Sequence, residues 1–130
     1  MNGDAIVEYS RIAGLENFYF EDSWVLSVTA KLNVLEIELD IVLTEDHWAY
    51  VTPGPKDKYS YRRALLIFGE MTEFTWRGIA SRPNAGVGNE APDYGNIDRF
   101  QSVDDCYELE GDFGQILVKS ARPLVVLVSQ

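Results

Sequence analysis

Two short polar strings hold the side chains best suited to chemistry. His47, the only histidine in the chain, stands in the string EDHWAY at positions 45–50. A carboxylate beside an imidazole orients the ring and raises its pKa, which is how a general base is assembled. Sequence neighbours in a loop need not meet in space, so a histidine that anchors its loop is the favoured interpretation. A lone histidine with no second ligand nearby also falls short of a zinc pattern.

The second string is DYGNID, at positions 93–98. Its Asp93, Asn96 and Asp98 are spaced much like the ligands of a calcium loop, and Tyr94 adds an aromatic ring. The full calcium-loop order, with a glutamate at the twelfth position, is missing. Turn-stabilising bonds from Asp93 and Asn96 to the backbone are favoured instead. Neither string predicts a metal ion or a cofactor.

Arg62 and Arg63 are adjacent in a stretch that becomes apolar two residues later. Successive side chains of a strand point to opposite faces, so one of these two arginines must approach the core or a cleft, where it needs a carboxylate partner. Tyr59 and Tyr61 share a face with Arg63. An arginine on the rim that pairs with Asp or Glu is favoured; the alternative is a pocket for an anionic group.

The element expected to position these side chains is one long β-hairpin. Alternating apolar and polar residues predict it over residues 24–44. Two alternating runs fold back on each other around Asn33 and Val34, and one face of the pair is apolar throughout. The predicted apolar pairs are Leu32–Leu35, Ala30–Ile37, Val28–Leu39, Leu26–Ile41 and Trp24–Leu43. Lys31 is expected to meet Glu36 on the other face. A slip of one residue would mix the two faces, so the pattern specifies the register.

The remaining segments complete a single domain over residues 1–130. A short helix is predicted over 5–13, and a strand over 59–68 whose apolar second half indicates a central position. This strand and the Phe74–Trp76 alternation predict a second hairpin. Residues 81–96 form a long loop, either mobile or functional, and further strands follow to residue 128. We expect a mainly β fold: an antiparallel sandwich or partly closed barrel of seven or eight strands with one short N-terminal helix.

Composition narrows the function classes. The formal charge is −10, which disfavours nonspecific binding to nucleic acid or anionic lipid. Solvated strand faces that keep the domain soluble are the favoured interpretation of this charge; the alternative is an acidic surface that steers a basic partner protein. Residues 1–50 carry a net charge of −8 and residues 90–112 one of −7. Cys106 is the single cysteine, so a reducing compartment is expected, and its acidic setting should raise its thiol pKa. The first residues lack the charge pattern of a signal peptide, and no apolar run approaches the ~20 residues of a membrane span. A cytoplasmic monomer or weak homodimer is predicted.

Four strings of the chain are similar to known proteins. They are Asp22–Val25, Leu35–Phe68, DYGNIDRF (93–100) and LEGDFGQILVKSARP (109–123). They resemble small bacterial β-rich families of unassigned function, some of which are grouped with immunity proteins of polymorphic toxin systems. The resemblance spans roughly residues 20–128 and brings no catalytic motif. It implies a bacterial, cytoplasmic protein without enzymatic activity.

The sequence therefore predicts an acidic, non-enzymatic interaction module, immunity-like, that blocks a partner protein by covering its surface. The exposed aromatics Trp48, Tyr50 and Tyr94 near the long loops are its expected contacts, with Asp93, Asn96 and Asp98 beside Tyr94. The alternative is a small-molecule-binding or weakly enzymatic pocket lined by His47, Tyr50, Tyr59, Arg62 or Arg63 and the 81–96 loop.

Overall fold

The computed structural model describes residues 6–55, 58–78 and 94–128, which form nine β-strands and one 3-10 turn. The elements are β1 (Ile6–Glu8), η1 (Tyr9–Arg11), β2 (Phe18–Ala30), β3 (Val34–Leu43), β4 (Ser60–Gly69), β5 (Glu73–Arg77), β6 (Gly95–Val103), β7 (Cys106–Gly111), β8 (Gly114–Lys119) and β9 (Leu124–Leu127). The mainly β, antiparallel prediction is confirmed. None of the helices found in the described residues is long and apolar enough to cross a membrane.

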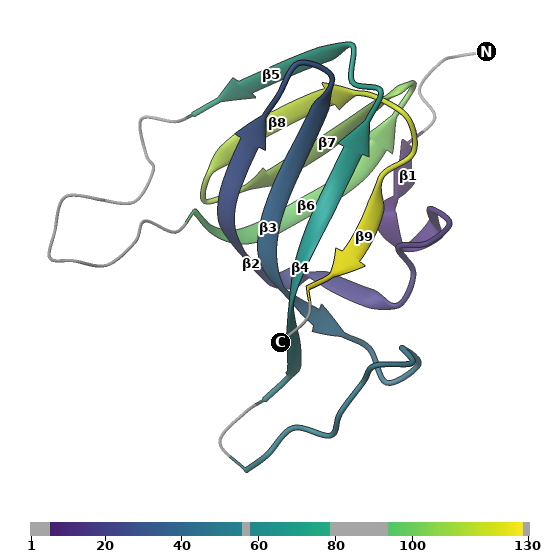
Figure 1. The fold of residues 1–130 in the computed structure, drawn as a ribbon, viewed down its shortest axis with the longest axis vertical. Helices are drawn as coiled ribbons and strands as arrows, with labels where there is room; N and C mark the ends of the chain where they lie inside the picture. The colour runs from purple at the N-terminus through teal and green to yellow at the C-terminus, as the bar shows by residue number, and fades with distance from the viewer. Residues whose placement is uncertain (1–5, 56–57, 79–93, 129–130) are drawn as a thin grey trace, which may run out of the picture.

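The strands form one antiparallel sheet folded into two layers (Figure 1). Its order is β5-β8-β7-β6-β2-β3-β4-β9, with β1 also paired to β6, and it does not close on itself. In Figure 1, β2, β3, β4 and β9 lie in front of β6, β7 and β8. The layers are joined where Trp24 and Val25 of β2 pair with Asn96 and Gly95 of β6.

The core lies between the two layers and is built from the alternating apolar positions. Phe20, Phe68 and Phe113 are its largest fully buried side chains. The Phe20 and Phe100 rings meet edge to face, with centroids 5.0 Å apart, a favoured aromatic geometry. Strand β4 contributes Ala64, Leu66 and Phe68 to this core, while its other face is only half-buried in its apolar part.

The hairpin of β2 and β3 is confirmed as a pair, but its register and its starting point differ from the prediction. Ala30 pairs with Leu35 and Val28 with Ile37, a shift of two residues that keeps the same faces together. Leu32 lies in the tip and is 96 % exposed. The predicted bond between Lys31 and Glu36 is present, with a 3.4 Å ion pair. The register of β2 against β3 shifts by one residue between Val25 and Ser27. From Val25 back toward the start of β2, the side chains predicted to face the core therefore face solvent, and the reverse.

Trp24 shows the consequence of this exchange. It was predicted to face the core opposite Leu43, but it pairs with Asp40 and is 41 % exposed. Val25 occupies the buried position instead, with 1 % exposure. A β-bulge adds a residue to one strand and reverses the side-chain alternation beyond it. The tryptophan is thereby moved from the core to the surface.

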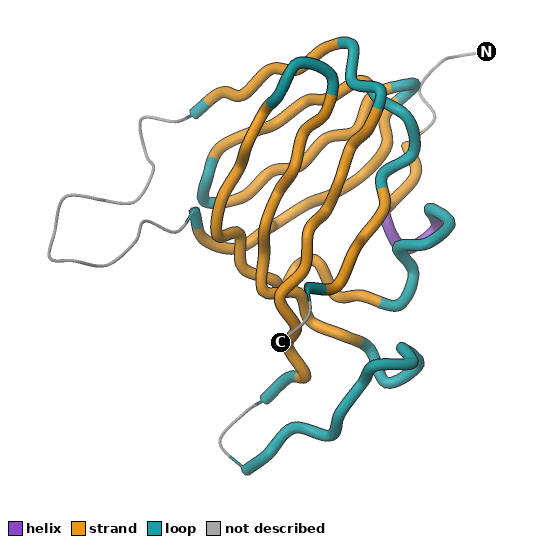
Figure 2. Tube along the Cα trace, viewed as in Figure 1, coloured by secondary structure: helices purple, strands orange, loops and turns teal. Residues whose placement is uncertain are grey.

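Two further predictions are wrong. The described part of the segment predicted as a helix over 5–13 contains β1 and the 3-10 turn η1 instead, since β1 finds hydrogen-bonding partners on β6. Figure 2 shows this turn as the one helical piece of the described chain. The predicted hairpin of β4 and β5 is absent, because β3 and β9 occupy both edges of β4 and β5 pairs with β8 in the other layer.

Candidate functional site

Two hollows on the surface are lined by residues from an irregular part of β2, where a β-bulge interrupts the strand. The pairing of β2 with β3 is interrupted between Tyr19 and Trp24, where the chain carries the polar residues Glu21, Asp22 and Ser23. Ser23 is fully buried there: its Oγ accepts a hydrogen bond from Val42 N–H at 3.0 Å and donates one to Tyr19 C=O at 2.8 Å. The hydroxyl thus replaces backbone partners that the bulge removes. Glu21 and Asp22, which precede it, line two different hollows.

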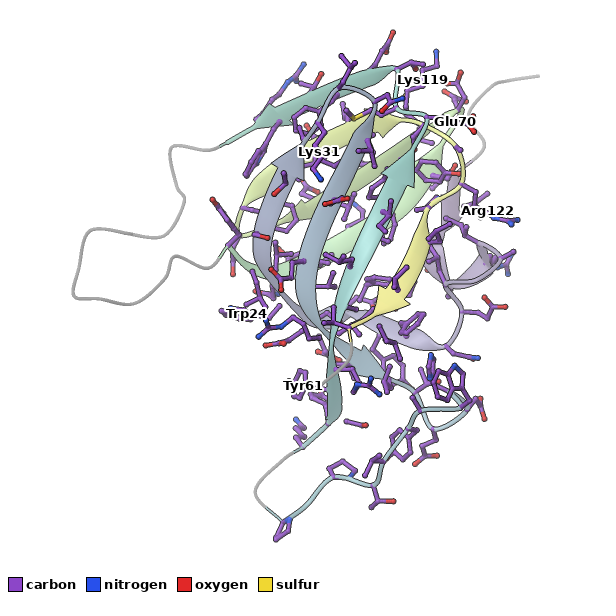
Figure 3. All side chains as sticks on the ribbon, in the orientation of Figure 1. Trp24, Lys31, Tyr61, Glu70, Lys119 and Arg122 are labelled. Atoms are coloured by element: carbon purple, nitrogen blue, oxygen red, sulfur yellow. The ribbon has the colours of Figure 1, made fainter. Side chains whose placement is uncertain are left out.

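The first hollow, which we call the aromatic groove, has a volume of about 500 Å³. It is lined by Asp22, Trp24, Asp40, Tyr61, Arg62 and Arg63. Trp24 and Tyr61 are 41 % and 46 % exposed. Figure 3 shows both rings on the same lower side of the sheet, coming from β2 and β4. Exposed aromatic rings beside charged groups are typical of binding surfaces, because they offer large contact area at little entropic cost.

The two arginines of this groove have different surroundings, as their opposite faces require. Arg63 is exposed and forms ion pairs with Asp40 at 3.1 Å and Glu38 at 3.2 Å. Arg62 is half-buried, and within the described residues no carboxylate pairs with it. Its Nη2 donates to Val128 C=O at 3.5 Å, and its buried Nε has no hydrogen-bond partner there. Arg63 is therefore the predicted rim arginine, and Arg62 is the one that approaches a cleft.

The second hollow, which we call the acidic cleft, has a volume of about 330 Å³ and adjoins β1, β2, β6 and β7. It is lined by Glu8, Tyr9, Glu21, Asp98, Arg99, Phe100, Gln101 and Glu110. Four carboxylates thus face it together with a single guanidinium, Arg99, which pairs with Glu110. The local charge is strongly negative, and walls of low dielectric focus such a field.

Tyr9 forms the back of the acidic cleft. Its side chain is 5 % exposed; its hydroxyl donates to Glu21 and accepts from Phe20 N–H at 3.2 Å. Burial, followed by the hydrogen bond to Glu21, raises the pKa of Tyr9 well above its usual value. The phenol therefore stays protonated, and it holds the Glu21 carboxylate in place rather than acting as a base.

His47 is a loop anchor, as favoured by the sequence. Its Nδ1 accepts a hydrogen bond from Ala49 N–H at 3.0 Å, and its ring contacts Phe18 with centroids 4.9 Å apart. Burial, followed by the charge of Arg62, lowers its pKa below the usual value. Trp48 stacks on the His47 ring and is 85 % exposed.

The small-molecule pocket considered from the sequence is not assembled as one site. Tyr50 and Tyr59 line a third hollow of about 370 Å³, together with Tyr19, Lys58 and neighbouring residues. Arg62 and Arg63 line the aromatic groove instead. His47 lines neither of these two hollows. Arg62 still acts on His47 through its charge.

From Gly95 onward the DYGNID string belongs to strand β6 rather than to an independent loop. Tyr94 N–H donates to Val25 C=O at 3.0 Å, and its ring packs on Trp76 at 5.7 Å. Asn96 Nδ2 donates to Asp98 Oδ1 at 3.0 Å. Asp93 and most of the 81–96 loop lie outside the described residues. Within those residues no group of three acids, cysteines or histidines is arranged to hold a metal ion.

Several site residues were missed by sequence reasoning. Trp24 was predicted to face the core, Glu8 fell within the helix predicted over 5–13, and Asp22 and Asp40 were not named as site residues. The bulge and the pairing of β1 with β6 bring them to the hollows. The one local signal in the sequence is the polar run of residues 21–23, since polar residues between two apolar runs mark an interruption of a strand.

Comparisons of the chain with protein-family models, with curated proteins and with solved structures gave no match.

Proposed function

We propose that this chain is a non-enzymatic interaction module of a bacterial cytoplasm, which binds a basic partner protein and blocks it by covering its surface. The acidic cleft is the observation that carries the proposal. It gathers the carboxylates of Glu8, Glu21, Asp98 and Glu110 around one hollow, opposed by Arg99 alone. A lysine or arginine side chain of a partner fits such a site by charge.

The charge of the whole chain supports the same partner class. A formal charge of −10 attracts a basic protein over a Debye length of about 10 Å and raises its association rate. The chain resembles families of unassigned function, some of which are grouped with immunity proteins of toxin systems, and this favours a toxin domain as the partner. The aromatic groove, reached from the same bulge of β2, offers Trp24 and Tyr61 as neighbouring apolar contacts.

The experiment is affinity capture from the native host with three forms of the protein. The wild type should recover a specific basic protein, and added salt should weaken the complex. The double variant Glu8→Lys/Asp98→Lys should lose that protein and no longer inhibit its activity. The control Glu16→Lys/Glu45→Lys changes the net charge equally at exposed acids outside the cleft. If both variants lose the partner alike, the cleft has no specific role; a capture that salt does not weaken contradicts the proposal.

A second candidate, an anion-binding groove, is favoured by Arg62. Its guanidinium is half-buried and has no carboxylate partner in the described chain. This arrangement lowers the stability of the fold unless a ligand supplies a negative charge. Trp24 and Tyr61 beside it fit a planar apolar body. The ligand class is then a small aromatic carboxylate, held by Arg62 and stacked on the groove.

Benzoate is the probe for this candidate, and benzylamine is its cationic counterpart. The indole N–H signal of Trp24 should shift with benzoate alone, while that of Trp76, bound to Phe113 C=O at 2.8 Å, should not. Arg62→Gln should abolish the response, whereas Arg122→Gln, an exposed arginine elsewhere, should leave it intact. Equal shifts with both probes would reject an anion site.

A further inference from the structure

In the described part of the chain the open sheet ends in two edge strands, β5 and β9. The three-residue strand β1 also has one unpaired side, because it pairs with β6 alone. Edge strands present unpaired N–H and C=O groups, and proteins protect them with charged residues, proline or bulges. Strand β5 is protected in this way, because Glu73 and Arg77 at its two ends are exposed and charged. Strand β9 reads LVVL and carries no charge along its length. The two edges are therefore not equivalent.

The free edge of β9 offers a defined set of backbone groups. Val128 N–H donates to Arg63 C=O at 2.8 Å. Val126 and Leu124 lie opposite Leu65 and Ile67, and because they are two and four residues from Val128, their backbone groups point toward β4 as well. In an antiparallel ladder only alternate residues bond to a given neighbour. The N–H and C=O groups of Val125 and Leu127 therefore point away from β4, toward the open side of the sheet.

The outer face of this edge is also apolar. Leu124 and Val126 are 53 % and 43 % exposed, and the half-buried Leu65 and Ile67 lie directly opposite them on β4. An exposed apolar row beside unpaired backbone groups is the arrangement that accepts an added strand. Affinity then comes from main-chain hydrogen bonds, and specificity from the alternate side chains of the added strand.

We propose that β9 is the docking edge for an extended segment of the basic partner, which adds to the sheet as a strand. This inference rests on the proposed function, from which the basic character of the segment follows: a chain of charge −10 attracts it. The segment carries apolar side chains at alternate positions, which cover Leu124 and Val126. Basic side chains between them lie on the opposite face of the added strand.

A second copy of the chain fits this edge less well. Two chains of charge −10 repel each other. A contact between two four-residue strands also provides only a small part of the roughly 1,200–2,000 Å² that stable interfaces bury. A basic partner does not meet this repulsion, because the charge of the chain attracts it.

The test uses the peptide acetyl-Lys-Val-Lys-Val-Lys-Val-Lys-amide and amide hydrogen exchange followed by NMR. Exchange reports local opening and pairing of individual N–H groups. On adding the peptide, exchange at Val125 and Leu127 should slow by at least about tenfold, with no change along β5. The same peptide N-methylated at every amide keeps its side chains but cannot pair as a strand, because its methyl groups clash with the edge and it can no longer donate to the C=O groups of Val125 and Leu127. It should therefore give no slowing.

Two variants complete the test. Val126→Lys places a like charge on the apolar row and should abolish the slowing, whereas Thr75→Lys, at an exposed position of β5, should leave it unchanged. Binding without slower exchange at Val125 and Leu127, equal binding of the N-methylated peptide, or no binding overturns strand addition. The capture experiment with the cleft variants still decides the proposed function. Slowing that depends on protein concentration, without peptide, would assign the edge to a second copy and overturn the inference.

Discussion

Ser23 is the residue whose substitution tests most directly how the bulge of β2 is held. It is fully buried, and its hydroxyl accepts from Val42 N–H and donates to Tyr19 C=O, at 3.0 and 2.8 Å. Ser23→Ala removes both bonds while leaving almost no cavity, because the two side chains differ by one oxygen atom. The effect on stability is therefore the effect of the hydrogen bonds.

The magnitude follows from the group that is left behind. Val42 is 1 % exposed, so its N–H cannot turn to water. A buried donor without an acceptor costs about 1–3 kcal/mol. We expect Ser23→Ala to lower the free energy of unfolding by about 2 kcal/mol. For a domain of this size, that loss lowers Tm by roughly 6–8 °C.

Urea unfolding followed by circular dichroism measures this difference. The midpoint should fall, and the slope with urea should stay the same, because the exposed surface on unfolding is unchanged. Ser27→Ala is the matched control in the same strand. The Ser27 hydroxyl lies 3.4 Å from the Glu38 carboxylate at a half-buried position, so its loss should change stability by less than about 0.5 kcal/mol. Equal midpoints for the two variants would refute the structural role given to Ser23.

Two further predictions concern a glycine and the histidine. Gly114 has φ +105°, and a Cβ there would lie 2.0 Å from Arg77 C=O, so Gly114→Ala should lose more than about 2 kcal/mol of stability. Gly54→Ala, with nothing within 4 Å, should be nearly neutral in the same unfolding assay. His47 should titrate below its usual pKa of 6.5 in proton NMR, because burial and Arg62 disfavour its charged form. As pH falls, His47 is protonated in the unfolded state at a higher pH than in the folded state. The contribution of neutral His47 to stability is therefore complete above pH 6.5 and is lost as pH falls through the lower pKa of the folded state. A titration midpoint of His47 at or above pH 6.5 would contradict this prediction. So would the same loss of stability at low pH in the variant His47→Gln.

The hairpin of β2 and β3 shows how far local pattern reaches. Alternation identified both strands and the faces near the tip, because the period of two is a property of each strand alone. It could not locate the bulges, since a bulge is fixed by partners from other segments, such as Ser23 Oγ on Val42 N–H. Trp24 was placed in the core for this reason. The exposed aromatic of the groove was thus hidden from sequence reasoning.

Pairing between distant segments was the other source of error. The short turn after β4 favoured a local hairpin, yet β5 pairs with β8 in the other layer, because β9 occupies the free side of β4. The helical spacing at the start of the chain was likewise overridden by the pairing of β1 with β6. Hydrogen bonds to distant strands decide between such local alternatives.

The sequence by itself determined the antiparallel β class, the negative charge and the opposite faces of Arg62 and Arg63. Each of these depends on composition or on the geometry of a single strand. Only the tertiary structure decided that Arg63 pairs with Asp40 while Arg62 has no carboxylate partner in the described chain. It also gathered acids from β1, β2, β6 and β7 around one cleft. Such sites are made by strands far apart in the chain, and no local pattern records which strands will meet.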